Sequence, residues 1–176
     1  MNHFDVIIVG LGPSGSIAAL LLETYGIKVL AIEKEKEIYN LPRAVTISDQ
    51  GFRMSQLAGI DHIYEENSTV LGGARFTDKD LNTIGNAIEL DGLISQNGWP
   101  PSSLFHQPYT DQAIREKLNN SKVEVLLEHE FKNLNHIDNQ NVIKVFNLKE
   151  QKEVEFTCRY LIGSDGGSSL VRKELN

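Results

Sequence analysis

The sequence has only one cysteine and no long apolar run, and these two shortages exclude several classes of protein. With Cys158 alone, neither an intrachain disulfide framework nor a cysteine-based zinc or iron–sulfur site can form. The longest apolar runs cover residues 6–9 and 17–22, far short of the roughly 20 residues that span a bilayer. The first residues also lack the basic region and cleavage site of a secretory signal. We therefore expect a cytoplasmic protein with no membrane partner.

Positive charge is also in short supply. Seventeen lysines and arginines stand against 24 aspartates and glutamates, which gives a formal net charge of -7. A field of this sign repels nucleic acid and anionic lipid, and we expect neither as a partner. A small phosphate ligand is compatible with this charge, because a local nest of backbone N–H groups can bind it. With 40% apolar and 23% charged residues, the 176-residue chain has the composition of one or two globular domains.

Metal-ligating and nucleophilic patterns are missing as well. The histidines show neither an HxxxH nor an HxH spacing, and we expect no metal site. Ser14 lies in GPSGS rather than in the GxSxG elbow of hydrolases, which argues against nucleophilic hydrolysis. We therefore assign no catalytic acid, base or nucleophile. The five histidines are His3, His62, His106, His129 and His136.

The beginning of the chain predicts a βαβ unit, in which a glycine-rich turn joins a β-branched strand to an apolar helix. Gly26 is a natural C-terminal cap for that helix, and the second strand ends at Glu33. The predicted elements are a strand over residues 4–9, a turn over 10–15, a helix over 16–25 and a strand over 27–32.

The turn GLGPSG has the glycine spacing of a dinucleotide-binding loop. Gly10 permits a tight turn, Gly12 lets the backbone approach a pyrophosphate, and Gly15 lets the helix pack closely on the strand. Free N–H groups at the start of the helix would face the anion. Glu33, at the end of the next strand, can accept hydrogen bonds from both ribose hydroxyls of an adenosine and would repel a 2′-phosphate.

The rest of the chain predicts two more helices and a group of strands. One helix covers residues 48–58, with Ser48 as a possible N-cap, and another covers 109–118, with Thr110 or Asp111 near its cap. Short polar strands and turns fill residues 74–99. The later strands are expected to form an antiparallel meander. These strands cover residues 123–128, 131–137, 142–148 and 154–162.

A second glycine-rich segment, RYLIGSDGGSSLVR over residues 159–172, follows the last strand. A strand that ends in glycines and an aspartate can place Asp165 and nearby N–H groups beside the same ligand, although an ordinary turn explains the pattern equally well. Paired with GLGPSG, this segment resembles the FAD-dependent aromatic hydroxylases, the single-component flavoprotein monooxygenases typified by p-hydroxybenzoate and 3-(3-hydroxyphenyl)propionate hydroxylases. LPRAV over residues 41–45 and FHQP over 105–108 resemble two further segments of that family.

The resemblance implies a set of cofactor-binding residues. Gly10, Gly12, Pro13, Ser14 and Gly15 would hold the pyrophosphate of FAD, Glu33 its adenosine ribose, and Lys34 would lie along the adenosine edge. Arg43 would lie against the cofactor, Gln107 would reach its ribityl or pyrophosphate part, and Phe131 would lie near the adenine. Asp165 and Gly166 belong to a motif associated with both FAD and the nicotinamide nucleotide. Without a ligand, Lys34 and Arg43 are interpreted as solvated cations, Gln107 as a loop cap and Phe131 as core.

The resemblance also implies a fold and a reaction. The fold class is α/β: a Rossmann-like FAD-binding βαβ sheet, an antiparallel β-meander and the start of a substrate-binding β layer. Residues 1–72 and 101–176 would form a discontinuous FAD-binding domain, and residues 73–100 a partial excursion into the substrate domain. FAD, with NADH or NADPH as electron donor, would serve the hydroxylation of a small phenolic or aromatic substrate by oxygen.

Members of this family are much longer than this chain and carry a second flavin motif, and two alternatives stay open. The chain is thus expected to be the N-terminal part of a hydroxylase, with weak or absent turnover by itself. It could instead belong to an FAD- or NAD-dependent reductase of the geranylgeranyl-reductase type, or act as a nucleotide-binding fragment with no turnover.

Overall fold

The computed structural model describes residues 3–85, 87–137 and 140–175. The chain divides into two compact units, one made of Met1–Tyr39 with Asp111–Asn176 and the other of Asn40–Thr110. The predicted excursion over residues 73–100 lies within the second unit, and its assignment to a substrate layer stays a prediction. Among the described residues, no helix has the length and apolar character that crossing a membrane requires.

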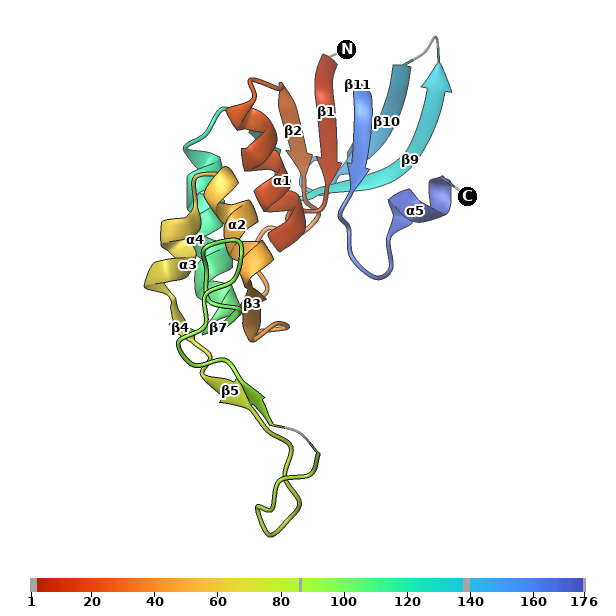
Figure 1. Cartoon of the computed structure of the whole chain (residues 1–176). Coiled ribbons are helices and arrows are strands. Elements are labelled where there is room, and N and C mark those ends of the chain that lie inside the picture. Colours follow the sequence, from red (N-terminus) through yellow and green to blue (C-terminus); the bar gives the residue numbers. More distant parts are fainter. Residues whose placement is uncertain (1–2, 86, 138–139, 176) are drawn as a thin grey trace. The chain divides into compact units, whose positions relative to one another are not determined.

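The first unit is built on a six-stranded sheet of order β8-β2-β1-β11-β10-β9 (Figure 1). Parallel pairing joins β8, β2, β1 and β11, and antiparallel pairing joins β11, β10 and β9. The predicted α/β class, with a parallel sheet and an antiparallel meander, is confirmed. The prediction for 123–128 needs correction, because this strand pairs in parallel with β2 and takes no part in the meander. The strands are β1 His3–Val9, β2 Val29–Ile32, β8 Glu124–Leu126, β9 His129–Ile137, β10 Gln140–Asn147 and β11 Lys152–Gly163.

Helix α1 (Pro13–Thr24) connects β1 to β2 and packs on both strands. It begins before the predicted start at residue 16, because proline suits the first helical position, where a missing N–H costs no hydrogen bond. Gly26 ends the turn after the helix with a φ of 73°, a left-handed conformation that favours glycine. A short helix, α5 (Leu170–Glu174), packs against β9.

One hydrophobic cluster runs through the parallel strands and the meander. Successive strand residues face opposite sides, and Ile7 of β1 lies in one cluster with Leu30 of β2. Phe131 of β9 and Ile143 of β10 belong to the same cluster, so the core extends from the parallel strands into the meander. The opposite face of β1 is buried too, since Ile8 is 0% exposed. This packing fixes the ends of β1 and β2, where the glycine turn and Glu33 follow.

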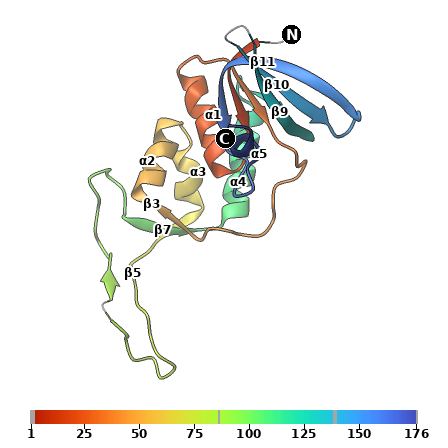
Figure 2. The same cartoon turned by 90° about the vertical axis from the view of Figure 1, so that its right-hand side faces the viewer.

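The second unit has a three-stranded antiparallel sheet of order β3-β7-β4 and a two-stranded arm formed by β5 and β6. Figure 2 shows the arm extending away from the three-stranded sheet of this unit. Phe52 stacks on Trp99 with ring centroids 4.8 Å apart, which gives the unit an aromatic core. Its elements are β3 Thr46–Ser48, α2 Asp49–Leu57, α3 Asp61–Glu66, β4 Ser68–Val70, β5 Gly73–Ala74, β6 Ile88–Glu89 and β7 Ser102–Phe105.

The helices in this part of the chain confirm one predicted cap and correct another. Ser48 caps α2 as predicted, because its Oγ accepts a hydrogen bond from Gly51 N at 3.3 Å. Helix α4 (Gln107–Asn119) begins earlier than predicted. Thr110 N already donates to His106 O at 3.3 Å, so Thr110 and Asp111 lie inside the helix and neither is its cap.

Candidate nucleotide-binding site

The packing of the chain requires glycine at two positions, Gly10 and Gly15, where β1 turns into α1. Gly10 has a φ of 95°, and a β-carbon there would lie 2.5 Å from the Ser164 carbonyl oxygen. A β-carbon at Gly15 would overlap the Gly10 carbonyl oxygen and Ser164 Oγ. The turn and the start of α1 are thus packed so tightly that neither position has room for a side chain.

Gly12 differs from its two neighbours in the motif. Its φ is −69°, which any residue can adopt, and a β-carbon there would have no atom of the chain within 4 Å. The residue is exposed. Nothing in the chain's own packing therefore requires glycine at this position, and the open space is suited to a ligand that approaches the backbone closely.

The N-terminus of α1 has the properties of an anion site. Gly12 is its N-cap residue and provides no side-chain capping bond, and the first turn contains no acidic residue. Pro13 has no N–H to offer, and the N–H groups of Ser14 and Gly15 have no acceptor within the helix because they belong to its first turn. These donors, together with the positive end of the helix dipole, favour a phosphate group in front of the turn.

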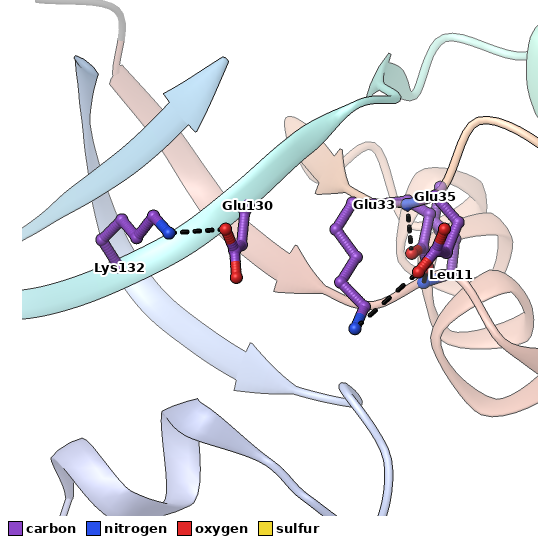
Figure 3. A network of polar contacts seen from close by, with 6 residues as sticks. Leu11, Glu33, Glu35, Glu130 and Lys132 are labelled. Atoms are coloured by element: carbon purple, nitrogen blue, oxygen red, sulfur yellow. Dashed lines mark hydrogen bonds and ion pairs between the residues drawn. The ribbon is translucent and has the colours of Figure 1, made fainter. Parts of the chain in front are cut away.

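Glu33 lies beside the same turn. Its carboxylate accepts hydrogen bonds from Leu11 N at 2.8 Å and from Glu35 N at 3.0 Å (Figure 3). A carboxylate has about four acceptor positions, so about two stay available for ribose hydroxyls. Lys34 is exposed and forms an ion pair with Glu35, with Nζ and Oε1 3.8 Å apart, a surface contact of little energetic weight.

The second glycine-rich segment meets the first one through Ser164, a residue that the sequence analysis did not single out. Ser164 Oγ donates to the carbonyl oxygens of Gly10, at 2.7 Å, and of Val9, at 3.0 Å, and its backbone N–H donates to the Val9 carbonyl. The pattern GSDGG points to the segment, but only the parallel pairing of β1 with β11 shows which side chain closes the contact.

Asp165 uses both of its carboxylate oxygens to hold the start of α5. Oδ1 accepts from Ser169 Oγ at 2.6 Å, and Oδ2 accepts from the backbone N–H groups of Leu170 and Val171 at 2.7 and 3.2 Å. Burial works against the charged carboxylate, but these hydrogen bonds outweigh burial and lower the pKa of Asp165 below its ordinary value. Gly166, with a φ of 80°, follows in a left-handed conformation that a side chain would strain.

Two other predicted site residues belong to the second unit, and a third belongs to the core of the first. Gln107 and Arg43 belong to the second unit, where Gln107 Oε1 accepts hydrogen bonds from Arg43 N and Ala44 N, each at 2.9 Å. Gln107 is 9% exposed and anchors this loop, which matches its interpretation as a loop cap. Phe131 is 3% exposed in the core of the first unit, which matches its interpretation as a core residue.

Arg115 is a charged residue near the turn that the sequence analysis missed. It is 8% exposed, and its Nη2 donates to the Leu11 carbonyl oxygen at 3.4 Å. Burial lowers the pKa of Arg115, whereas the nearby charges of Glu33 and Asp111 act in the opposite direction. In the sequence, Arg115 stands among the charged residues of a helix and gives no sign that it is buried. Throughout residues 3–85, 87–137 and 140–175, no group of three or more His, Cys, Asp or Glu side chains could hold a metal ion.

Comparison with known proteins agrees with this geometry. The family model described as an FAD binding domain matches residues 3–176. The chain belongs to this family of FAD-binding domains. The 3-(3-hydroxy-phenyl)propionate/3-hydroxycinnamic acid hydroxylase of Comamonas testosteroni is 33% identical over 175 residues, which are 98% of this chain and 29% of that protein. A hydroxylase of the same description from Burkholderia vietnamiensis is 31% identical over 98% of this chain and 27% of its own length. This FAD-binding domain thus spans less than a third of these curated relatives.

Solved structures share the fold of this FAD-binding domain. The p-nitrophenol 4-monooxygenase PnpA from Pseudomonas putida superimposes with a TM-score of 0.88 at 20% identity, over 100% of this chain and 44% of that one. The flavin-dependent monooxygenase PieE, solved in complex with FAD and substrate, gives a TM-score of 0.84 at 22% identity, over 98% of this chain and 32% of that one. At these identities the similarity establishes the fold.

Proposed function

We propose that the glycine turn of this FAD-binding domain holds the pyrophosphate of FAD and that Glu33 binds the adenosine ribose. The observation that carries the proposal is the contrast between Gly12 and its two neighbouring glycines. Gly10 and Gly15 are required by packing, whereas Gly12 leaves open space in front of free N–H groups. The Glu33 carboxylate lies beside that space and has about two acceptor positions that the described residues do not use.

The remaining site residues have supporting roles in this proposal. Lys34 is exposed and would lie along the adenosine edge. Gln107 shapes the loop that carries Arg43 through two backbone hydrogen bonds, so that Arg43 presents its side chain from a fixed backbone. Asp165 and Gly166 hold the segment whose Ser164 closes on the glycine turn. The burial of Phe131 supports a packing role. Phe131 would then act on an adenine pocket indirectly, by packing beneath it in the core.

For the whole protein we propose a flavin-dependent monooxygenase that hydroxylates a small phenolic or aromatic compound in the cytoplasm. The printed descriptions of the relatives, hydroxylases of 3-(3-hydroxy-phenyl)propionate and 3-hydroxycinnamic acid, support this substrate class. Bound FAD would supply the electron transfer from NADH or NADPH to oxygen, chemistry that side chains lack. In this proposal the described residues bind and orient the adenylate end of the cofactor.

The arm in the second unit supports an assignment of residues 73–100 to the start of a substrate-binding layer. Large apolar side chains are exposed along it, among them Phe76 and Leu81, each 75% exposed. The two strands β5 and β6 pair only with one another and leave their other edges without a neighbour among the described residues. Further strands of a longer protein would cover such edges.

A calorimetric titration tests the cofactor assignment. We expect FAD and ADP to bind this chain with similar affinity, because the site recognises the adenylate end that both contain. FMN, which has the flavin but no adenylate, is the matched control and is expected not to bind. Equal binding of FMN and FAD, or no binding of ADP at millimolar concentration, would contradict the assignment.

Product analysis tests the reaction class. With FAD, NADH, labelled oxygen and 3-(3-hydroxyphenyl)propionate, we expect oxygen consumption that ends mainly in hydrogen peroxide and at most a trace of labelled hydroxylated product. A reduced product formed without oxygen would contradict a monooxygenase and favour a reductase.

A further inference from the structure

Leu11, between the first two glycines of the turn, is held through both of its backbone polar groups. Its N–H donates to Glu33 Oε2 at 2.8 Å. Its carbonyl oxygen accepts from Ser16 Oγ at 3.1 Å and from Arg115 Nη2 at 3.4 Å. Leu11 itself is only 6% exposed. Side chains from the end of β2, from α1 and from α4 thus converge on one residue of the turn.

The two hydrogen bonds to the Leu11 carbonyl oxygen determine where the N–H of Gly12 points. The C=O and N–H of a trans peptide unit point in opposite directions. Because the Leu11 carbonyl points toward the buried Arg115 and Ser16, the N–H of Gly12 points away from them, on the exposed side of the turn. The contact with Arg115 therefore aims the Gly12 donor at the proposed pyrophosphate position.

Arg115 also brings a charge to this place. The guanidinium cannot lose its proton in a protein, so a positive charge is buried directly behind the turn. A buried charge requires compensation, and Glu33 and Asp111 are the acidic groups that interact with it. A diphosphate in front of the turn would add negative charge only one peptide unit away from the guanidinium. Low solvent exposure strengthens such an interaction.

We propose that Arg115 is a positioning residue for the dinucleotide site, one that fixes the Leu11–Gly12 peptide and favours a diphosphate through its buried charge. The inference rests on the proposed function, since it refines the same site. It predicts that Arg115 acts on the diphosphate part of a ligand and leaves the adenosine part almost unaffected. A purely structural role would affect both parts equally.

Three variants of the full chain test this proposal: Arg115→Met, which removes the charge at similar length, Arg115→Lys, which keeps the charge, and Lys117→Met as the control. Lys117 lies on the exposed side of the same helix, so its replacement changes the net charge equally. By NMR titration we expect Arg115→Met to bind ADP about tenfold more weakly, the effect of losing one charged hydrogen bond. Adenosine binding should change less than about twofold, and Arg115→Lys should recover part of the ADP affinity.

The outcomes separate this inference from the proposed function. Unchanged ADP affinity in Arg115→Met, or equal losses for ADP and adenosine, would overturn the role of Arg115 while the wild-type titration still supports the site. If Arg115→Met does not fold, Arg115→Lys decides, with weaker ADP binding and unchanged adenosine binding expected. If the wild type binds no ADP, the proposed function fails. Hydrogen exchange of the Leu11 amide then tests only whether Arg115 fixes the Leu11–Gly12 peptide. Faster exchange in Arg115→Lys than in Lys117→Met supports this role, and equal exchange overturns it.

Discussion

Replacing Gly12 and Gly15 by alanine, one at a time, should separate ligand binding from folding within a single motif. At Gly15 the new methyl group would lie closer to the Gly10 carbonyl oxygen than the 3.0 Å that β-carbons keep from other atoms. At Gly12 it would meet no atom of the chain within 4 Å, and the φ of −69° suits alanine. The same chemical change therefore has different physical consequences only three residues apart.

The magnitudes follow from these contacts. Overpacking at Gly15 costs about 1–3 kcal/mol. Displacing Ser164 from its bond to the Gly10 carbonyl adds about 1 kcal/mol. The better helix propensity of alanine returns up to ~1 kcal/mol, so we expect Gly15→Ala to lower the free energy of unfolding by about 1–4 kcal/mol. At Gly12, the reduced entropy of the unfolded chain and the poorer N-cap nearly cancel, which leaves stability within ~0.5 kcal/mol of wild type.

Urea denaturation and ADP titration of both variants check this prediction. Gly12→Ala should denature at the wild-type midpoint but bind ADP at least about tenfold more weakly, because the methyl group occupies the space in front of the N–H donors. Gly15→Ala should denature at a lower urea concentration. Wild-type ADP affinity in Gly12→Ala would show that the open space at Gly12 is not the ligand site, and equal destabilisation in the two variants would contradict the packing difference between them.

Three further perturbations follow from single contacts. Gln107→Ala removes the acceptor of two backbone N–H groups and should lower the free energy of unfolding by about 2 kcal/mol in urea, whereas Gln107→Glu, which keeps an acceptor, should lose less. The pKa of Asp165 is lower in the folded protein than in the unfolded protein, where it is about 4. The carboxylate therefore stabilises the fold fully above about pH 4, and this stabilisation is lost as the pH falls through the pKa of the folded protein. Asp165→Asn should therefore cost stability at pH 7 and progressively less as the pH falls below about 4, and a cost that does not change with pH would refute the role of the carboxylate. Burial raises the pKa of Cys158 to about 11, so a thiol reagent at pH 8 should label it only after unfolding; rapid labelling of the folded chain would contradict its burial.

The βαβ start could be predicted because its signals are local. A β-branched run, a glycine turn and an apolar helix follow each other without a break, and β1 (His3–Val9) agrees with the predicted strand within one residue. The predicted helix begins later than α1 because the glycine pattern includes Pro13 in the turn, although proline is common at the first helical position.

Features that depend on distant pairing could not be predicted in the same way. A short strand such as β8 has the same β-branched pattern whether its neighbour is parallel or antiparallel, and its pairing with β2 is a property of the whole sheet. Arg115 looks like a surface cation because burial of a helical residue depends on what packs against it. For Asp165, the sequence located the segment correctly, but the hydrogen bonds to Ser169 and the start of α5 appear only in three dimensions.

Backbone amide shifts measured while FAD is added to the labelled chain show where the cofactor binds. If the glycine turn binds the pyrophosphate, the largest shifts, saturating together, belong to the amides of Gly12, Ser14 and Gly15, with a further shift at Leu11, whose N–H is bound by Glu33. Shifts that cluster in another part of the chain, or none at saturating FAD, would contradict binding at the turn.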